Sequence, residues 1–134
     1  MMQISIPPPS TLRKRILCIE DDEDTCLLLT ELLSYAGYEV VSAQTAAEGV
    51  KLAQSNGFAL YLLDNWLPDG SEVDACKLIR SFDSNTPIIF YSAAVYDLDR
   101  QQALEAGAQV YLGKPVAIDL LLQTIEHQVK QQPN

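Results

Sequence analysis

Acidic residues directly follow two apolar runs of this sequence, and they are the residues best placed to take part in chemistry. Glu20 and Asp21 come directly after the run Ile16–Ile19, and Asp64 comes directly after the run Ala59–Leu63. Charge at the end of a buried strand is costly without a partner, because burial removes the water that stabilises it. A cation is therefore expected beside these carboxylates. Oxygen ligands favour a hard divalent ion, and a site with few protein ligands is typical of Mg²⁺.

Ser92 and Lys114 follow two further apolar runs. Ser92 comes after Ile88–Tyr91, and Lys114 stands before Pro115, shortly after Val110–Leu112. Each alone has an ordinary explanation, since a Ser at a strand end is most often a helix cap and a Lys before Pro is most often a surface residue. Together with the carboxylates they supply a nucleophile, a metal site, a hydrogen-bond donor and a counter-charge for phosphate. Phosphoryl transfer to an aspartate requires this combination.

Two other polar features have simpler explanations. Asp22, Glu23 and Asp24 are a solvated helix start, where carboxylates gain a little from the helix dipole. His127 is the only histidine and lies in a polar stretch of the last helix, so we interpret it as a surface residue. A phosphohistidine donor would then belong to a partner.

Short continuous apolar runs indicate strands that are buried on both faces, as in a parallel sheet. The five runs are Ile16–Ile19, Val40–Ala43, Ala59–Leu63, Ile88–Tyr91 and Val110–Leu112.

Segments with helical spacing separate and follow these runs. The first carries Cys26, Leu29, Leu33 and Ala36 on one face before Gly37. The second opens with the capping-box pair Thr45 and Glu48. The third starts at Ser71 and is expected to bury Ala75, Leu78, Ile79 and Phe82; the fourth ends near Ala106; the last carries Ile118, Leu121, Leu122, Ile125 and Val129 on one stripe.

Alternation of five strands and five helices predicts an α/β fold with helices on both faces of a parallel sheet. Five strands match the flavodoxin-like order 2-1-3-4-5. In such folds ligands bind beyond the carboxyl ends of the strands, where the first and third strands meet. This is the edge that carries the acidic residues.

Composition limits the classes of function. The chain has 134 residues, 48% of them hydrophobic, and a formal net charge of −9. This fits one globular domain and disfavours a nucleic-acid or anionic-membrane surface. Three cysteines without C-x-x-C spacing are expected to be reduced core thiols. With neither a signal-peptide pattern nor an apolar run long enough to span a membrane, we expect a cytoplasmic protein with no membrane contact.

Several motifs, in this order and spacing, resemble those of the response-regulator receiver domain of two-component signalling. The resemblance is to receiver domains of the chemotaxis-regulator kind. The motifs are Ile16-Leu17-Cys18-Ile19-Glu20-Asp21-Asp22, Leu62-Leu63-Asp64-Asn65-Trp66-Leu67-Pro68-Asp69-Gly70, Tyr91-Ser92-Ala93, Ala103-Leu104-Glu105-Ala106-Gly107-Ala108 and Tyr111-Leu112-Gly113-Lys114-Pro115. On this basis we expect an extended tail over residues 1–14, a receiver domain over 15–130 and a polar end over 131–134. One departure is Glu72, where many receivers carry glycine.

The resemblance implies a metal-dependent phosphoacceptor. Asp64 would accept the phosphoryl group, and Glu20 and Asp21 would hold Mg²⁺. Asp64 itself and the main-chain carbonyl of Trp66 would be further metal ligands.

The resemblance also implies a switch. Ser92 and Tyr111 would be the switch residues, Lys114 would hold the phosphoryl oxygens, and the bond before Pro115 would be cis. An alternative for Tyr111 is a strand aromatic that packs on the last helix.

By resemblance, this domain is a phosphorylation-dependent signalling switch and not a conventional enzyme, although it would catalyse its own Mg²⁺-dependent phosphotransfer and dephosphorylation. Its partners would be a sensor histidine kinase or a histidine phosphotransfer protein and a downstream protein target, with no direct contact to nucleic acid. The fourth helix, the last strand and the last helix would carry the signal, and a phosphorylation-dependent dimer is compatible with the family.

Two other classes remain as alternatives. An aspartyl-phosphate hydrolase of the haloacid-dehalogenase type needs an acid two residues after its nucleophile, and Trp66 occupies that position. A non-phosphorylated interaction module usually lacks part of the acidic, hydroxyl and lysine set, which is complete here.

Overall fold

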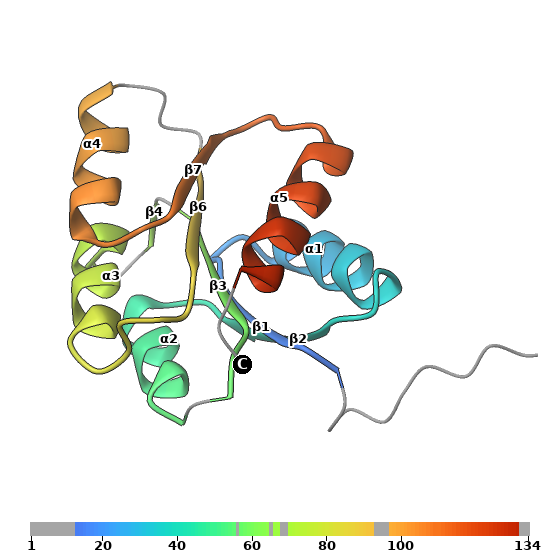
Figure 1. The fold of residues 1–134 in the computed structure, drawn as a ribbon, viewed down its shortest axis with the longest axis horizontal. Helices are drawn as coiled ribbons and strands as arrows, with labels where there is room; N and C mark the ends of the chain where they lie inside the picture. The colour runs from blue at the N-terminus through green and yellow to red at the C-terminus, as the bar shows by residue number, and fades with distance from the viewer. Residues whose placement is uncertain (1–12, 56, 65, 68–69, 93–96, 132–134) are drawn as a thin grey trace, which may run out of the picture.

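A five-stranded parallel sheet forms the centre of the molecule (Figure 1). The computed structural model describes residues 13–55, 57–64, 66–67, 70–92 and 97–131, with the backbone alone at 66–67 and 70–71. The strand order is β2-β1-β3-β6-β7, which confirms the predicted order 2-1-3-4-5. The strands are β1 (Arg15–Ile19), β2 (Glu39–Ala43), β3 (Leu60–Asp64), β6 (Ile88–Ser92) and β7 (Val110–Gly113).

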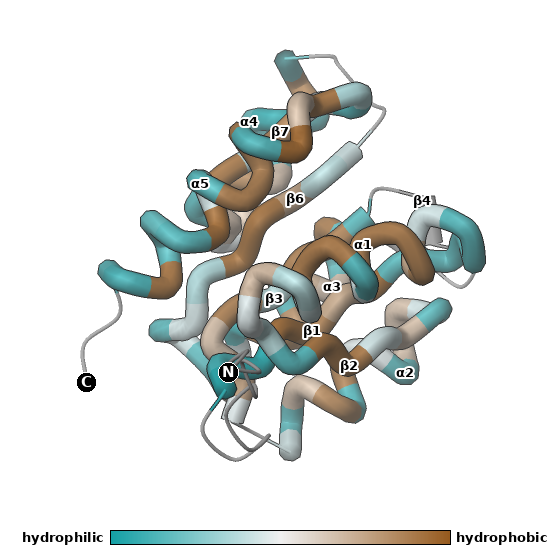
Figure 2. Tube along the Cα trace, turned by 90° about the vertical axis from the view of Figure 1, so that its right-hand side faces the viewer, coloured by the Kyte–Doolittle hydropathy of each residue, from teal (hydrophilic) through white to brown (hydrophobic). Residues whose placement is uncertain are grey.

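Five helices cover the two faces of the sheet. They are α1 (Glu23–Tyr35), α2 (Ala46–Ala53), α3 (Glu72–Arg80), α4 (Asp97–Ala106) and α5 (Ile118–Lys130). Helices α1 and α5 lie on one face, while α2, α3 and α4 lie on the other (Figure 1). Each face has its own apolar core, and all five residues of β3 are buried between them. Figure 2 shows the apolar strands β1 and β6 in brown within the molecule.

Two helix starts follow the predicted local chemistry. Asp22 is the N-cap of α1 and accepts a 2.9 Å hydrogen bond from the main-chain N–H of Thr25. Thr45 is the N-cap of α2, and its hydroxyl accepts a 3.1 Å hydrogen bond from the N–H of Glu48. These bonds satisfy main-chain donors that have no partner within the helix.

Some predictions of burial were wrong. Leu78 and Phe82, expected in the core, are 55% and 39% exposed, and Ile118 is 45% exposed. In α3 the buried face instead comprises Glu72, Ala75, Cys76 and Ile79. The helical period identified α3 correctly, but it did not reveal which apolar residues of this segment remain in contact with solvent.

A short antiparallel pair was not predicted. Strand β4 (Trp66–Leu67) pairs with β5 (Gly70–Ser71) directly after β3, so the chain folds back before α3 begins. Cys18, Cys26 and Cys76 are free and buried, as expected. None of the helices in the described ranges combines the length and the apolar character needed to cross a lipid bilayer.

Arg80 lies at the end of α3 and joins this helix to the loop before β6 and to the loop before β7. These loops lie at the end of the sheet opposite the acidic residues. Its guanidinium donates to the carbonyl oxygen of Gly107 from Nε and Nη2, at 3.0 and 2.9 Å. It also donates to the carbonyl oxygens of Asp83 and Thr86 and to the side-chain oxygen of Gln109, at 2.8–3.0 Å. All five N–H donors of a guanidinium are thus used, in a planar pattern that lysine cannot reproduce.

We predict that Arg80→Lys lowers the free energy of unfolding by about 2 kcal/mol, because several carbonyl groups lose a charged donor. Urea denaturation monitored by circular dichroism measures the change. Arg100→Lys, at an exposed position of α4, is the matched control and should change stability by no more than about 0.5 kcal/mol. Equal losses for the two variants would contradict the structural role given to Arg80.

Candidate functional site

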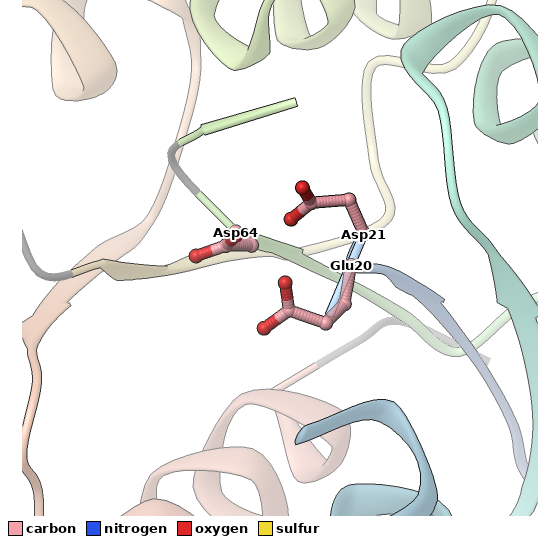
Figure 3. A group of neighbouring side chains, drawn as sticks. All are labelled: Glu20, Asp21 and Asp64. Atoms are coloured by element: carbon pink, nitrogen blue, oxygen red, sulfur yellow. The ribbon is translucent and has the colours of Figure 1, made fainter. Parts of the chain in front are cut away.

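Three carboxylates meet where β1 and β3 end (Figure 3). Glu20 and Asp21 follow β1, and Asp64 is the last residue of β3, which pairs with β1 in parallel. One carboxylate oxygen of each residue lies within 4.8 Å of the others. Glu20 is 1% exposed and Asp64 8%, whereas Asp21 is exposed. The site is therefore partly buried, with an opening on the side of Asp21.

Lys114 partly neutralises this group of acids. Its Nζ atom lies 2.9 Å from Oδ1 of Asp64 and 3.2 Å from Oε1 of Glu20. The ammonium also lies 4.8 Å from the centre of the Tyr91 ring, a cation–π contact that the sequence did not suggest. The structure brings together the predicted residues Glu20, Asp21, Asp64 and Lys114, which lie up to 94 positions apart in the chain.

The proton affinities in the site follow from burial and from the neighbouring charges. Burial, a hydrogen bond with the Asp64 carboxyl and the negative charge of Asp64 raise the pKa of Glu20 to about 7, while Lys114 acts in the opposite direction. Burial acts to lower the pKa of Lys114, but hydrogen bonds and charges from Asp64 and Glu20 raise it above its ordinary value. One ammonium therefore does not fully offset the carboxylates.

The residues present fit a hard divalent cation. All three side chains offer oxygen, two of them are buried, and their oxygens converge. The second oxygen of Glu20 accepts a hydrogen bond of 3.3 Å from the N–H of Asp22, which helps to orient that carboxylate. Oxygen ligands that leave room for water are characteristic of protein sites for Mg²⁺. Trp66 lies in β4, two residues after Asp64, and its carbonyl remains a predicted fourth ligand.

Ser92 and Tyr111 lie on the neighbouring strands β6 and β7. Ser92 is fully buried at the end of β6, and its side chain shares a hydrogen bond with that of Tyr111. The Tyr111 ring stacks on Phe90 with 6.0 Å between ring centres. Burial raises the pKa of Tyr111, and the hydrogen bond with Ser92 opposes that effect. The hydroxyl groups of the two predicted switch residues are thus directly connected.

The alternative placement of Tyr111 was wrong. Tyr111 belongs to the core on the side of α2, α3 and α4, and not to the core beneath the last helix, α5. Ala103 and Ala106 of α4 belong to the same core. Any rotation of its ring would therefore change packing around α4.

Lys114 is held in place by the strand next to it. Its main-chain N–H donates to the carbonyl of Ser92 at 2.6 Å, in register with the pairing of Ser92 and Gly113. The peptide bond between Lys114 and Pro115 is cis. The same strand pair therefore positions both the ammonium and the buried hydroxyl.

Comparison with protein families identifies one model that matches most of the chain. Residues 16–126 match the family model described as the response regulator receiver domain. The match includes every residue that we place at the site.

Similar proteins include two bacterial regulators. The chain is 35% identical over 116 residues to the uncharacterized transcriptional regulatory protein YkoG of Bacillus subtilis, an alignment that covers 87% of this chain and 51% of YkoG. It is 34% identical over 111 residues to the transcriptional regulatory protein CusR of Escherichia coli, covering 83% of this chain and 49% of CusR. The chain thus spans about half the length of these relatives.

Solved structures share the fold. A CheY-like response regulator receiver domain protein from Methanospirillum hungatei has a TM-score of 0.86 and 30% identity, covering 90% of this chain and 96% of that one. The receiver domain of a sensor histidine kinase from Pseudomonas aeruginosa has a TM-score of 0.82 and 26% identity, covering 89% and 99%. That second structure has a magnesium ion coordinated in its active site cleft.

We predict that Asp64→Asn increases the free energy of unfolding by about 1 kcal/mol at pH 8 without divalent metal, because it removes one of two buried like charges. The pKa of Glu20 is raised to about 7 in the folded state, so the cost of ionising Glu20 is present above that pH and disappears as pH falls toward 4.5. The gain should therefore shrink at pH 5.

Urea denaturation at the two pH values, with a chelator present, measures this difference. Glu31→Gln, at an exposed position of α1, is the control and should have little effect at either pH. A stability loss in Asp64→Asn at pH 8 would show that the ion pair of Asp64 with Lys114 outweighs the repulsion from Glu20.

Proposed function

Because this chain belongs to the response regulator receiver domain family, we propose that Asp64 accepts a phosphoryl group from a phosphohistidine of a sensor kinase or phosphotransfer protein. A bond forms between a carboxylate oxygen of Asp64 and phosphorus, while the bond from phosphorus to the donor histidine breaks. The observation that supports this proposal most strongly is the contact of Lys114 with both Asp64 and Glu20, beside the exposed Asp21.

The side chains divide the work of this reaction. Glu20, Asp21 and Asp64, with the carbonyl of Trp66, would hold Mg²⁺, which supplies positive charge for the phosphoryl oxygens. The ammonium of Lys114 already lies 2.9 Å from Asp64. After transfer it can pair with a negatively charged phosphoryl oxygen on Asp64. Asp64 pairs with this ammonium and would act as the nucleophile. Dephosphorylation would use the same residues with water as the acceptor.

The output begins at Ser92. A phosphoryl oxygen on Asp64 offers its hydroxyl a stronger, charged acceptor than Tyr111 does. Ser92 would then exchange its hydrogen bond with Tyr111 for one with the phosphoryl group, and the Tyr111 ring would repack beside α4. Moving such an equilibrium from 1:99 to 99:1 needs about 5.5 kcal/mol of differential binding. The proposed output surface is formed by α4, β7 and α5.

The proposed function also implies partners, a cellular location and an oligomeric response for the domain. Its partners would be a histidine kinase or phosphotransfer protein and a downstream protein target, in the cytoplasm, and phosphorylation could promote dimer formation. The domain itself would not contact nucleic acid. The relatives named as transcriptional regulatory proteins are about twice as long, so that expectation concerns the receiver domain alone.

We predict that incubation with acetyl phosphate and Mg²⁺ adds one phosphoryl group to the wild-type chain and none to Asp64→Asn. Intact-mass spectrometry measures the product directly. Asp119→Asn, at an exposed position of α5, should be modified like the wild type. Absence of a wild-type adduct, or an equal adduct on Asp64→Asn, would exclude Asp64 as the acceptor.

We also predict that Lys114→Gln slows phosphorylation by at least about tenfold, because the transferred group loses its fixed positive partner. A chelator should suppress the reaction of every variant. The time course of the mass adduct gives the rates, and Lys51→Gln, at an exposed site of α2, is the control for loss of one positive charge. Similar rates for the two Lys variants would argue against a direct role for Lys114.

A further inference from the structure

A second acidic feature lies outside the phosphorylation site, between α3 and α4. These helices pack against each other on one side of the sheet (Figure 1). A groove of about 610 Å³ between them is lined by Glu72, Val73, Lys77, Gln102, Glu105 and Ala106. Two carboxylates, one ammonium, an amide and two apolar side chains thus border one opening.

Glu72 is an unusual member of this lining. It is the first residue of α3 and only 8% exposed, although it carries an ionisable group. Within the described ranges, its carboxylate has a hydrogen bond with its own main-chain N–H and with no other residue. Lys77 lines the same groove, yet no salt bridge joins it to a carboxylate in the part of the chain that the structure describes.

The surroundings of Glu72 are strongly negative. Burial raises its pKa to about 7, and the charges of Asp64 on β3, Asp99 on α4 and Asp74 on α3 act in the same direction, against its own N–H. Glu105 is a further carboxylate at the exposed rim and accepts a 3.0 Å hydrogen bond from Gln101. A buried carboxylate in such a setting gains most from a positively charged partner.

The shape and chemistry of the groove favour an organic cation over a metal ion. Among the described residues, a group of three or more carboxylates converges closely enough for a metal ion only at Glu20, Asp21 and Asp64. At the groove, by contrast, the lining combines the carboxylates of Glu72 and Glu105 with the apolar side chains of Val73 and Ala106. An ammonium group on an alkyl chain would match both parts, because its charged end pairs with a carboxylate while its methylene groups cover apolar surface.

We propose that the groove between α3 and α4 binds an alkylammonium group, with Glu72 holding the ammonium and Glu105 assisting at the rim. Val73 and Ala106 contact the alkyl chain. The ammonium can come from a free polyamine or from a lysine side chain of a protein partner, since the two share this chemistry. The site is separate from the phosphorylation site, and its occupation does not require phosphorylation.

The test uses butylamine as the probe and the whole, unphosphorylated chain. Nuclear magnetic resonance titrations at pH 8 and constant ionic strength, with a chelator present, follow the backbone amides of α3 and α4. At this pH Glu72 is mostly ionised and the amine is mostly protonated. Butylamine should shift these amides in a saturable manner and lower the pKa of the Glu72 carboxyl, whereas 1-butanol should do neither.

Variants identify the residues that bind. Glu72→Gln should weaken butylamine binding by about tenfold or more, and Glu105→Gln by several-fold, while Glu31→Gln should bind as the wild type does. Glu105 is exposed, so its replacement tests the site even if Glu72→Gln disturbs folding. The titration uses neither Mg²⁺ nor acetyl phosphate, so its outcome is independent of the proposed phosphotransfer.

Two further probes distinguish the sources of the ammonium. Tighter binding of 1,4-diaminobutane than of a capped Ala-Lys-Ala peptide points to a polyamine, and the reverse order points to a protein lysine. Equal shifts with butanol and butylamine, or binding that Glu72→Gln and Glu105→Gln leave unchanged, would overturn the proposal. So would amide shifts confined to the neighbourhood of Glu20 and Asp21.

Discussion

The attraction between one lysine and two buried carboxylates determines what this sheet edge can do. A parallel sheet places the ends of β1 and β3 side by side, so the acids that follow these strands cannot avoid each other. Lys114 follows β7, which pairs with β6 on the side away from β3. Its ammonium offsets part of the free-energy cost of burying the two carboxylates when no metal is bound. This compensation is only partial, because the pKa of Glu20 is still raised. A further positive charge would therefore be bound favourably at this edge of the sheet.

The same arrangement connects the acids to the rest of the fold. The main-chain bond from Lys114 to Ser92 fixes the ammonium relative to β6, and the Ser92 hydroxyl is in turn bonded to Tyr111. Tyr111 then packs in the core shared with α4. A change of charge at Asp64 can therefore affect the packing of α4. The effect would pass through a short series of direct contacts between the adjacent strands β3, β6 and β7.

Much of this arrangement could be predicted from the sequence, because the relevant signals are local. Continuous apolar runs identified the strands, and acids placed directly after two of them identified the site. The failures concern contacts between distant segments. The helical period of α3 could not reveal that Leu78 remains 55% exposed, and the run of β7 could not reveal that Tyr111 lies in the core shared with α4 and not in the core beneath α5. The cation–π contact of Lys114 with Tyr91 and the five bonds of Arg80 join segments whose spacing in the chain carries no signal.

The network around Arg80 restricts how the proposed output surface, formed by α4, β7 and α5, can move. Gly107 directly follows α4, and its carbonyl is bound twice by the guanidinium at the end of α3. Its backbone has φ +117°, and a Cβ atom there would lie 2.7 Å from Arg80, so the two are packed as closely as a glycine allows. The C-terminal end of α4 is thus anchored, and a displacement of this helix is greatest at its opposite end. The helix would swing about a fixed hinge point instead of sliding along the sheet.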